Sequence, residues 1–155
     1  MKIRYLTLLM IPFLTGCNVD RPYDGPKLKI EYSEAGEVIE CTPDFLYQHA
    51  ITDEVDSIYY IGDDLCIACQ QLKPQLNAWC NVYKGAIYYI PISNITEDNM
   101  HFLIDATVGQ HYEWSDKDPV PAVYFFMETN VLFRGDGENT MNYLNRYVEV
   151  LPNNG

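Results

Sequence analysis

The chain has 155 residues, and its 22 aspartates and glutamates outnumber its 10 lysines and arginines, which gives a formal net charge of −12. Nucleic acids and anionic membrane surfaces are bound through clustered cationic side chains, so this charge argues against a nucleic-acid-binding protein and against a polybasic membrane contact. The length suits one domain, which we expect to be a monomer.

Residues 1–16 have the pattern of an export signal. Lys2 and Arg4 form a basic head, the apolar run YLTLLMIPFLTG is too short to span a bilayer, and small residues precede Cys17. The run LTGC resembles the lipobox of bacterial lipoproteins. That resemblance implies that Cys17 is acylated through its thiol, becomes the new N-terminus and anchors an extracytoplasmic protein to a bacterial membrane. An ordinary secretory signal with a chance cysteine is the alternative.

Strand and helix patterns alternate after the signal. Two prolines, a glycine and mixed charge are typical of a tether at 17–27, before a domain at 28–155. We expect strands at 28–32, 38–39, 57–62, 86–93, 121–127 and 130–135. The helices should open at Pro43, at Cys66, after a cap at Ser93 or Thr96, and near Met141, the last running to Leu151. This order predicts an α/β fold, a mixed four- to five-stranded sheet with helices on both faces.

The tyrosines and one proline add detail to this prediction. The 13 tyrosines, many in YY pairs on predicted strands, are typical of sheet and core positions. Pro74 falls inside the helix that follows Cys66 and should kink it, because proline lacks an amide hydrogen and its ring crowds the preceding turn.

Cys66 and Cys69 form a CxxC pair where the strand at 57–62 meets the next helix. The first sulfur would lie at the helix N-terminus, where unpaired amides and the helix dipole favour a thiolate. The second would lie about a turn away, more buried and within bonding distance. Such a pair suits attack on a disulfide and its resolution. A static disulfide, or an idle pair on a binding scaffold, is the alternative.

These features together resemble the thioredoxin-like family. Pro74 matches the family's helix-kinking proline, five residues after Cys69, and Pro121 in VPAVYFF matches its cis-proline before a strand. A strand hairpin and a closing helix then follow in the family's order, so the resemblance covers roughly residues 51–151. The runs IYYIG and IYYI around the CxxC helix further resemble the small exported proteins called bacteriocin transport accessory proteins.

The resemblance implies roles for individual residues. Cys66 would be the nucleophile that forms a mixed disulfide and Cys69 the resolving thiol. Val120 and cis-Pro121 would shape a groove in which the backbone of Val120 pairs with an extended partner chain.

The sequence also departs from the family. Leu65 replaces the tryptophan before the first cysteine, and Tyr60 stands where the family has a buried carboxylate. Asp63 and Asp64 lie on the loop before the thiols, at a distance that the sequence does not fix. Which group transfers the proton, and in which direction the pair works, therefore stay open.

Metal and cofactor sites have little support. No second CxxC and no HxxxH accompanies the dithiol, so we expect no metal, with His101 or His111 as minor candidates. GxGxxG and Walker-type motifs are missing, so we expect no cofactor. Cys41 and Cys80 either pair structurally or remain buried free thiols.

The sequence therefore predicts a membrane-anchored thiol-disulfide oxidoreductase that exchanges disulfides with extracytoplasmic protein partners. The alternative is a non-catalytic binding or accessory module for an exporter or a secreted peptide.

Overall fold

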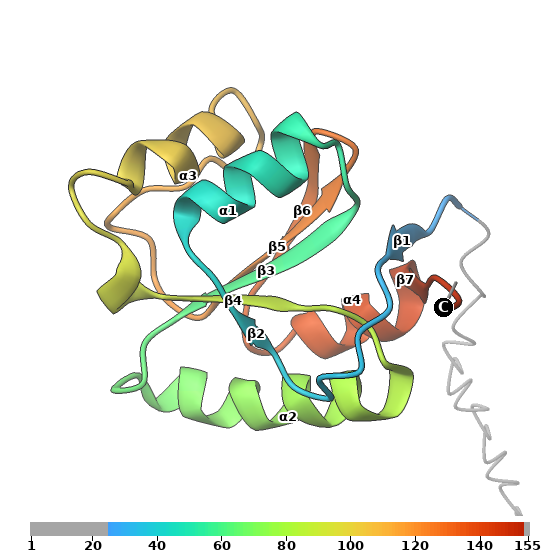
Figure 1. Ribbon diagram of the computed structural model, residues 1–155. Coiled ribbons are helices and arrows are strands. Elements are labelled where there is room, and N and C mark those ends of the chain that lie inside the picture. The colour runs from blue at the N-terminus through green and yellow to red at the C-terminus, as the bar shows by residue number, and fades with distance from the viewer. Residues whose placement is uncertain (1–24, 154–155) are drawn as a thin grey trace, which may run out of the picture.

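The computed structural model describes residues 25–153. The export signal, Cys17 and most of the tether lie outside these residues. A five-stranded sheet with helices on both faces forms the body of the described chain (Figure 1). The strands are β1 (Leu28–Ile30), β2 (Ile39–Glu40), β3 (Ser57–Gly62), β4 (Tyr88–Pro91), β5 (Ala122–Met127), β6 (Asn130–Gly135) and β7 (Val148–Val150). The helices are α1 (Pro43–Leu46), α2 (Ile67–Tyr83), α3 (Met100–Thr107) and α4 (Thr140–Tyr147).

The main sheet has the order β2-β4-β3-β5-β6. β2, β4 and β3 are parallel, whereas β5 runs antiparallel to β3 and β6 antiparallel to β5. All six residues of β3 are buried, because this strand lies at the centre and is covered on both faces. The mixed sheet with helices on both faces confirms the predicted α/β fold class.

α2 and α4 cover one face of the sheet, and α1 and α3 cover the other (Figure 1). A hydrophobic cluster lies on each face. Alternate residues of β3 divide between them, so Tyr60 packs with α2 and α4 while Tyr59 packs with α1 and α3. Cys80 belongs to the first cluster and Cys41 packs against the second, with the sheet between them. They cannot bond, and all four cysteines of the described residues are free thiols. The YY pairs at 59–60 and 88–89 are buried, as predicted.

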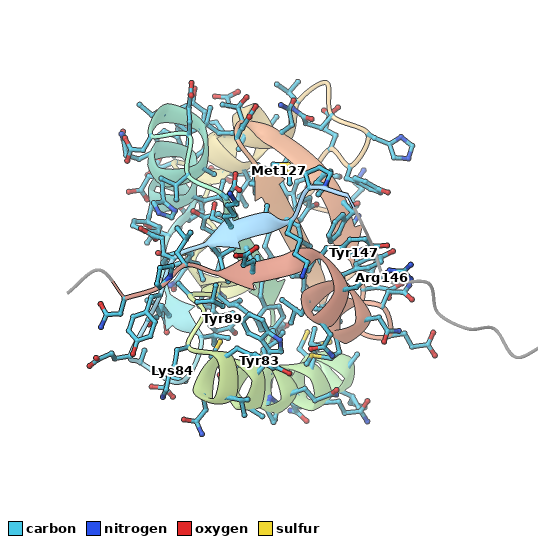
Figure 2. The ribbon with its side chains drawn as sticks, turned by 90° about the vertical axis from the view of Figure 1, so that its right-hand side faces the viewer. Tyr83, Lys84, Tyr89, Met127, Arg146 and Tyr147 are labelled. Atoms are coloured by element: carbon cyan, nitrogen blue, oxygen red, sulfur yellow. The ribbon has the colours of Figure 1, made fainter. Side chains whose placement is uncertain are left out.

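The chain beyond Tyr147 differs from the prediction. The expected helix to Leu151 ends at Tyr147, and residues 148–150 form β7, which pairs in parallel with β1. The alternation of valine, glutamate and valine suits a strand. β1, which lies 120 residues earlier in the sequence, offers the edge with which this strand pairs. Figure 2 looks onto this pair, beside Tyr83 and Lys84 at the end of α2.

Other boundaries also differ, while the start of α1 agrees with the prediction. The strand expected at 86–93 pairs with its neighbours only over 88–91 and then turns into a 3-10 helix. Asn99, not Ser93 or Thr96, precedes α3, and its side chain accepts the Thr96 amide at 2.7 Å. α1 begins after Thr42 with Pro43 at its first turn, as predicted, and continues as a π-helix over Tyr47–Thr52. No helix within residues 25–153 has the length and apolar character needed to cross a membrane.

Candidate active site

A tight loop carries the chain from β3 into α2 and places Cys66 at the start of the helix. The Cys66 amide donates to the Asp63 carbonyl at 3.1 Å, and the Leu65 amide donates to the Asp63 carboxylate at 2.9 Å. Cys66 has an extended backbone and is the N-cap of α2. The sequence therefore placed the first cysteine correctly, at the end of a helix whose first amides lack helical partners.

The Cys66 sulfur lies between two backbone groups. It accepts the Cys69 amide at 3.2 Å and lies 3.5 Å from the carbonyl oxygen of Val120, to which its thiol donates. The Val120–Pro121 peptide bond is cis, as the resemblance implied. The fold thus brings the loop before β5 against the dithiol across 54 residues of sequence. The Cys69 amide is thus aimed at the sulfur at the N-terminus of α2.

Cys69 is much less accessible than Cys66. It is 2% exposed, while Cys66 is only partly buried. Burial raises the pKa of the Cys69 thiol to about 11, although the Asp63 amide, 3.5 Å from its sulfur, acts in the opposite direction. Cys69 is therefore a protonated thiol at neutral pH. Because only Cys66 is open to a partner, the two sulfurs are suited to the roles of attacking and resolving thiol.

The two loop carboxylates do not turn to the thiols. The Asp63 carboxylate accepts a hydrogen bond from the Leu65 amide. The Asp64 carboxylate accepts the Tyr89 hydroxyl at 3.3 Å and pairs with the Lys73 ammonium at 3.5 Å. Their proximity in sequence thus does not make either one a direct partner of a sulfur.

The surface around Cys66 is apolar. Leu65 is 88% exposed and Ile67 is 74% exposed, on either side of Cys66. Next to Val120 lies a pocket of about 220 Å³, in which buried Trp114 forms part of the wall. The other lining residues are Ile61, Ile92, Ile95, Met100, Ser115, Asp116 and Asp118. This surface can bury apolar side chains that flank a disulfide in a partner.

The helix that carries the dithiol contains a proline. Pro74 lies inside α2, as predicted, and gives no amide hydrogen to the turn before it. The expected kink stays a prediction.

The sequence left Tyr60 without a role, but its hydroxyl lies beside Cys69. Gly62 lies two residues later on the same face of β3, and the absence of a side chain there is the sequence signal that the Tyr60 ring fills the space.

Metal ligands do not gather here. Within residues 25–153, no group of three or more His, Cys, Asp or Glu side chains is placed to hold a metal ion.

Comparison with known proteins identifies the fold. No protein-family model matches the sequence, and no curated protein matches it. Thioredoxin O1 from Arabidopsis thaliana, in its oxidized state, matches 73% of this chain and 99% of its own, with a TM-score of 0.53 and 16% identity. Thioredoxin O2 from the same plant covers 76% and 99%, with a TM-score of 0.53 and 13% identity. A thioredoxin mutant from Halobacterium salinarum covers 76% and 96%, with a TM-score of 0.51 and 17% identity.

Proposed function

From its thioredoxin fold and its CxxC pair, we propose that the chain is a thiol-disulfide oxidoreductase that acts on extracytoplasmic protein partners while anchored to a membrane through lipid on Cys17. The observation that carries the redox activity is the position of Cys66, partly exposed at the N-terminus of α2 with the Cys69 amide on its sulfur. The export signal and the LTGC run support the anchor. Fold alone does not imply an activity, so the site carries the proposal.

The reaction follows from the difference between the two sulfurs. The Cys66 thiolate attacks a partner disulfide, a bond forms between Cys66 and one partner sulfur, and the other partner sulfur leaves as a thiolate that takes up a proton. Cys69 then loses its proton and attacks the Cys66 sulfur. The Cys66–Cys69 disulfide forms and the second partner thiolate is released. The partner gains two electrons, the dithiol loses two, and an oxidising reaction runs in reverse.

The loop before β5 supports a protein as the partner. The Val120 carbonyl already lies 3.5 Å from the nucleophilic sulfur, so a chain that pairs with this backbone has its disulfide next to Cys66. Exposed Leu65 and Ile67 offer apolar contact on the other side.

Cys69→Ala is expected to trap mixed disulfides, because the substitution removes the resolving thiol and leaves Cys66 in place. Cells that make the full chain with this change should accumulate covalent adducts of Cys66 with other proteins. Trapping with an alkylating agent, followed by non-reducing electrophoresis, measures them. A reductant should cleave these adducts, and the Cys66→Ser/Cys69→Ala control should not form them. If no adducts form and the double variant keeps full function in cells, the chain is a binding module and the redox proposal is wrong.

Cys17→Ser is expected to release the protein from the membrane, because the hydroxyl cannot receive the thioether-linked lipid. Most of the protein should move from the membrane fraction to the soluble fraction, with a mass that lacks acyl chains. Cys41→Ser changes a thiol within the domain and should leave the protein in the membrane fraction. Equal membrane retention in both variants would contradict the anchor.

A further inference from the structure

We infer that the Tyr60 hydroxyl is a positioning group for the resolving step, in which it donates a hydrogen bond to the sulfur of Cys69 as this thiol becomes a thiolate. The inference rests on the proposed thiol-disulfide exchange and assigns a residue to its second half.

The geometry places the hydroxyl next to Cys69. Tyr60 is fully buried on β3, and its hydroxyl donates to the Cys69 carbonyl at 3.4 Å. Hydroxyl–oxygen bonds are ordinarily about 2.5–3.0 Å long, so this one is weak and little is lost when the hydroxyl turns to a better acceptor. Burial raises the pKa of the Cys69 thiol, and the nearby hydroxyl acts in the opposite direction. A thiolate is an ionised acceptor and would hold the hydroxyl more strongly.

Gly62 leaves the space that the phenol occupies. Residues 60 and 62 point to the same face of β3. A Cβ atom on Gly62 would meet the Tyr60 hydroxyl oxygen at 2.4 Å and its ring carbons at 2.5 and 2.8 Å. Any larger residue at this position would push the phenol away from Cys69. The close approach of ring and backbone is therefore a property of this pair of residues.

Neighbouring side chains hold the ring in this place. Tyr89 stacks on Tyr60 with ring centroids 4.9 Å apart and an angle of 22° between the rings. Tyr89 is held in turn by the Asp64 carboxylate at its hydroxyl and by the Lys73 ammonium 4.0 Å from its ring centroid. The Tyr60 hydroxyl thus has little freedom except rotation about its C–O bond.

The chemistry of the resolving step needs such a donor. Cys69 has to lose a proton although burial raises the pKa of its thiol to about 11. Burial also raises the pKa of Tyr60, so its phenol stays protonated and acts as a donor, not as a base. A pocket of about 260 Å³ is lined by Cys69 together with Tyr60, Asp63 and Asp64, and through it the proton would leave to solvent. The Asp63 amide is the second donor to the sulfur.

The test uses 5,5′-dithiobis(2-nitrobenzoate), which reports each half of the reaction without a natural partner. With one equivalent of this reagent, attack by Cys66 releases one thionitrobenzoate and leaves the other bound to Cys66. Attack by Cys69 then releases the second, and its rate is the resolving step. The full chain is used in mild detergent, with Cys17→Ala in every sample so that only the four described thiols remain.

Tyr60→Phe should slow the second release about threefold at pH 7 and leave the first unchanged. If loss of the donor raises the pKa of Cys69 by about one unit, tenfold less thiolate is present, and the greater nucleophilicity of that thiolate recovers about threefold. The pH at which the rate of the second release is half-maximal should also rise by about one unit. Tyr124→Phe is the matched control, because among residues 25–153 this buried hydroxyl has no hydrogen-bond partner, and it lies on the opposite face.

Equal second-phase rates and pH midpoints in Tyr60→Phe and Tyr124→Phe would overturn the inference. Equal slowing of both phases in Tyr60→Phe would also overturn it, because a merely structural effect would disturb the whole site. Failure of the proposed function looks different, because the parent protein would then show no second release.

Discussion

Cys66→Ser is expected to lower the rate of protein-disulfide reduction by about a hundredfold or more, to the background rate of the reductant. A thiolate is the nucleophile in disulfide exchange, and a serine hydroxyl stays protonated at neutral pH and forms no disulfide. Cys69 cannot take over, because it is 2% exposed and its pKa of about 11 leaves little thiolate. Insulin reduction with dithiothreitol as electron donor measures the rate.

The control for this change is Cys41→Ser. It makes the same chemical replacement at a thiol packed against the opposite face of the sheet, and it should keep the parental rate. Urea unfolding of Cys66→Ser should give a midpoint near that of the parent, because the serine hydroxyl fits the space of the partly buried thiol and can still donate to the Val120 carbonyl. A parental rate in Cys66→Ser, or an equal loss in Cys41→Ser, would remove Cys66 from its proposed role.

Phe125→Ala is expected to destabilise the fold by about 3–5 kcal/mol, the usual cost of emptying a phenylalanine site in a core. Phe125 is 0% exposed in β5, and its ring centroid lies 4.4 Å from that of Phe133 on β6 and 6.1 Å from that of Tyr143 on α4. Removal of the ring leaves a cavity where the sheet meets α4. Because small domains are stable by only about 5–15 kcal/mol, much of this variant should lose its fold on mild warming.

Chemical denaturation followed by circular dichroism measures the change for Phe125→Ala. Leu132→Ala on the neighbouring strand is the control, since Leu132 is 41% exposed and its loss should cost less than about 1 kcal/mol. If both variants unfolded at the same urea concentration, the ring cluster would not hold α4 to the sheet.

Local patterns predicted much of the site. The CxxC spacing at a change from strand to helix pattern placed Cys66 at the N-terminus of α2, and the resemblance of VPAVYFF to the family implied the cis bond before Pro121. Both are signals within a few residues. The approach of Val120 to the Cys66 sulfur was implied by the resemblance alone, because no local pattern encodes a contact across 54 residues.

The parts that the sequence did not predict depend on long-range contacts. Residues 148–150 have the apolar spacing of a helix as well as that of a strand, and the edge of β1 decides between them. Likewise, apart from Gly62 two residues later, nothing near Tyr60 indicates which of the two tyrosines at 59–60 lies beside a thiol. The face of β3 that packs on α2 settles it. The loop aspartates illustrate the converse, since their position beside the dithiol suggested contacts that Lys73, Tyr89 and Leu65 take instead.

Under the proposed anchor, the direction of α2 decides which end of the domain lies farther from the point of attachment. Cys66 begins this helix, and its other end lies beside the β1–β7 pair, near both ends of the described chain (Figure 1). Its 17 residues separate the two by about 25 Å. A fully extended tether at 18–27 would add up to about 35 Å. With Cys17 in lipid as proposed, the dithiol would lie at the far end of α2 from the attachment, with a reach of up to roughly 60 Å into the aqueous space.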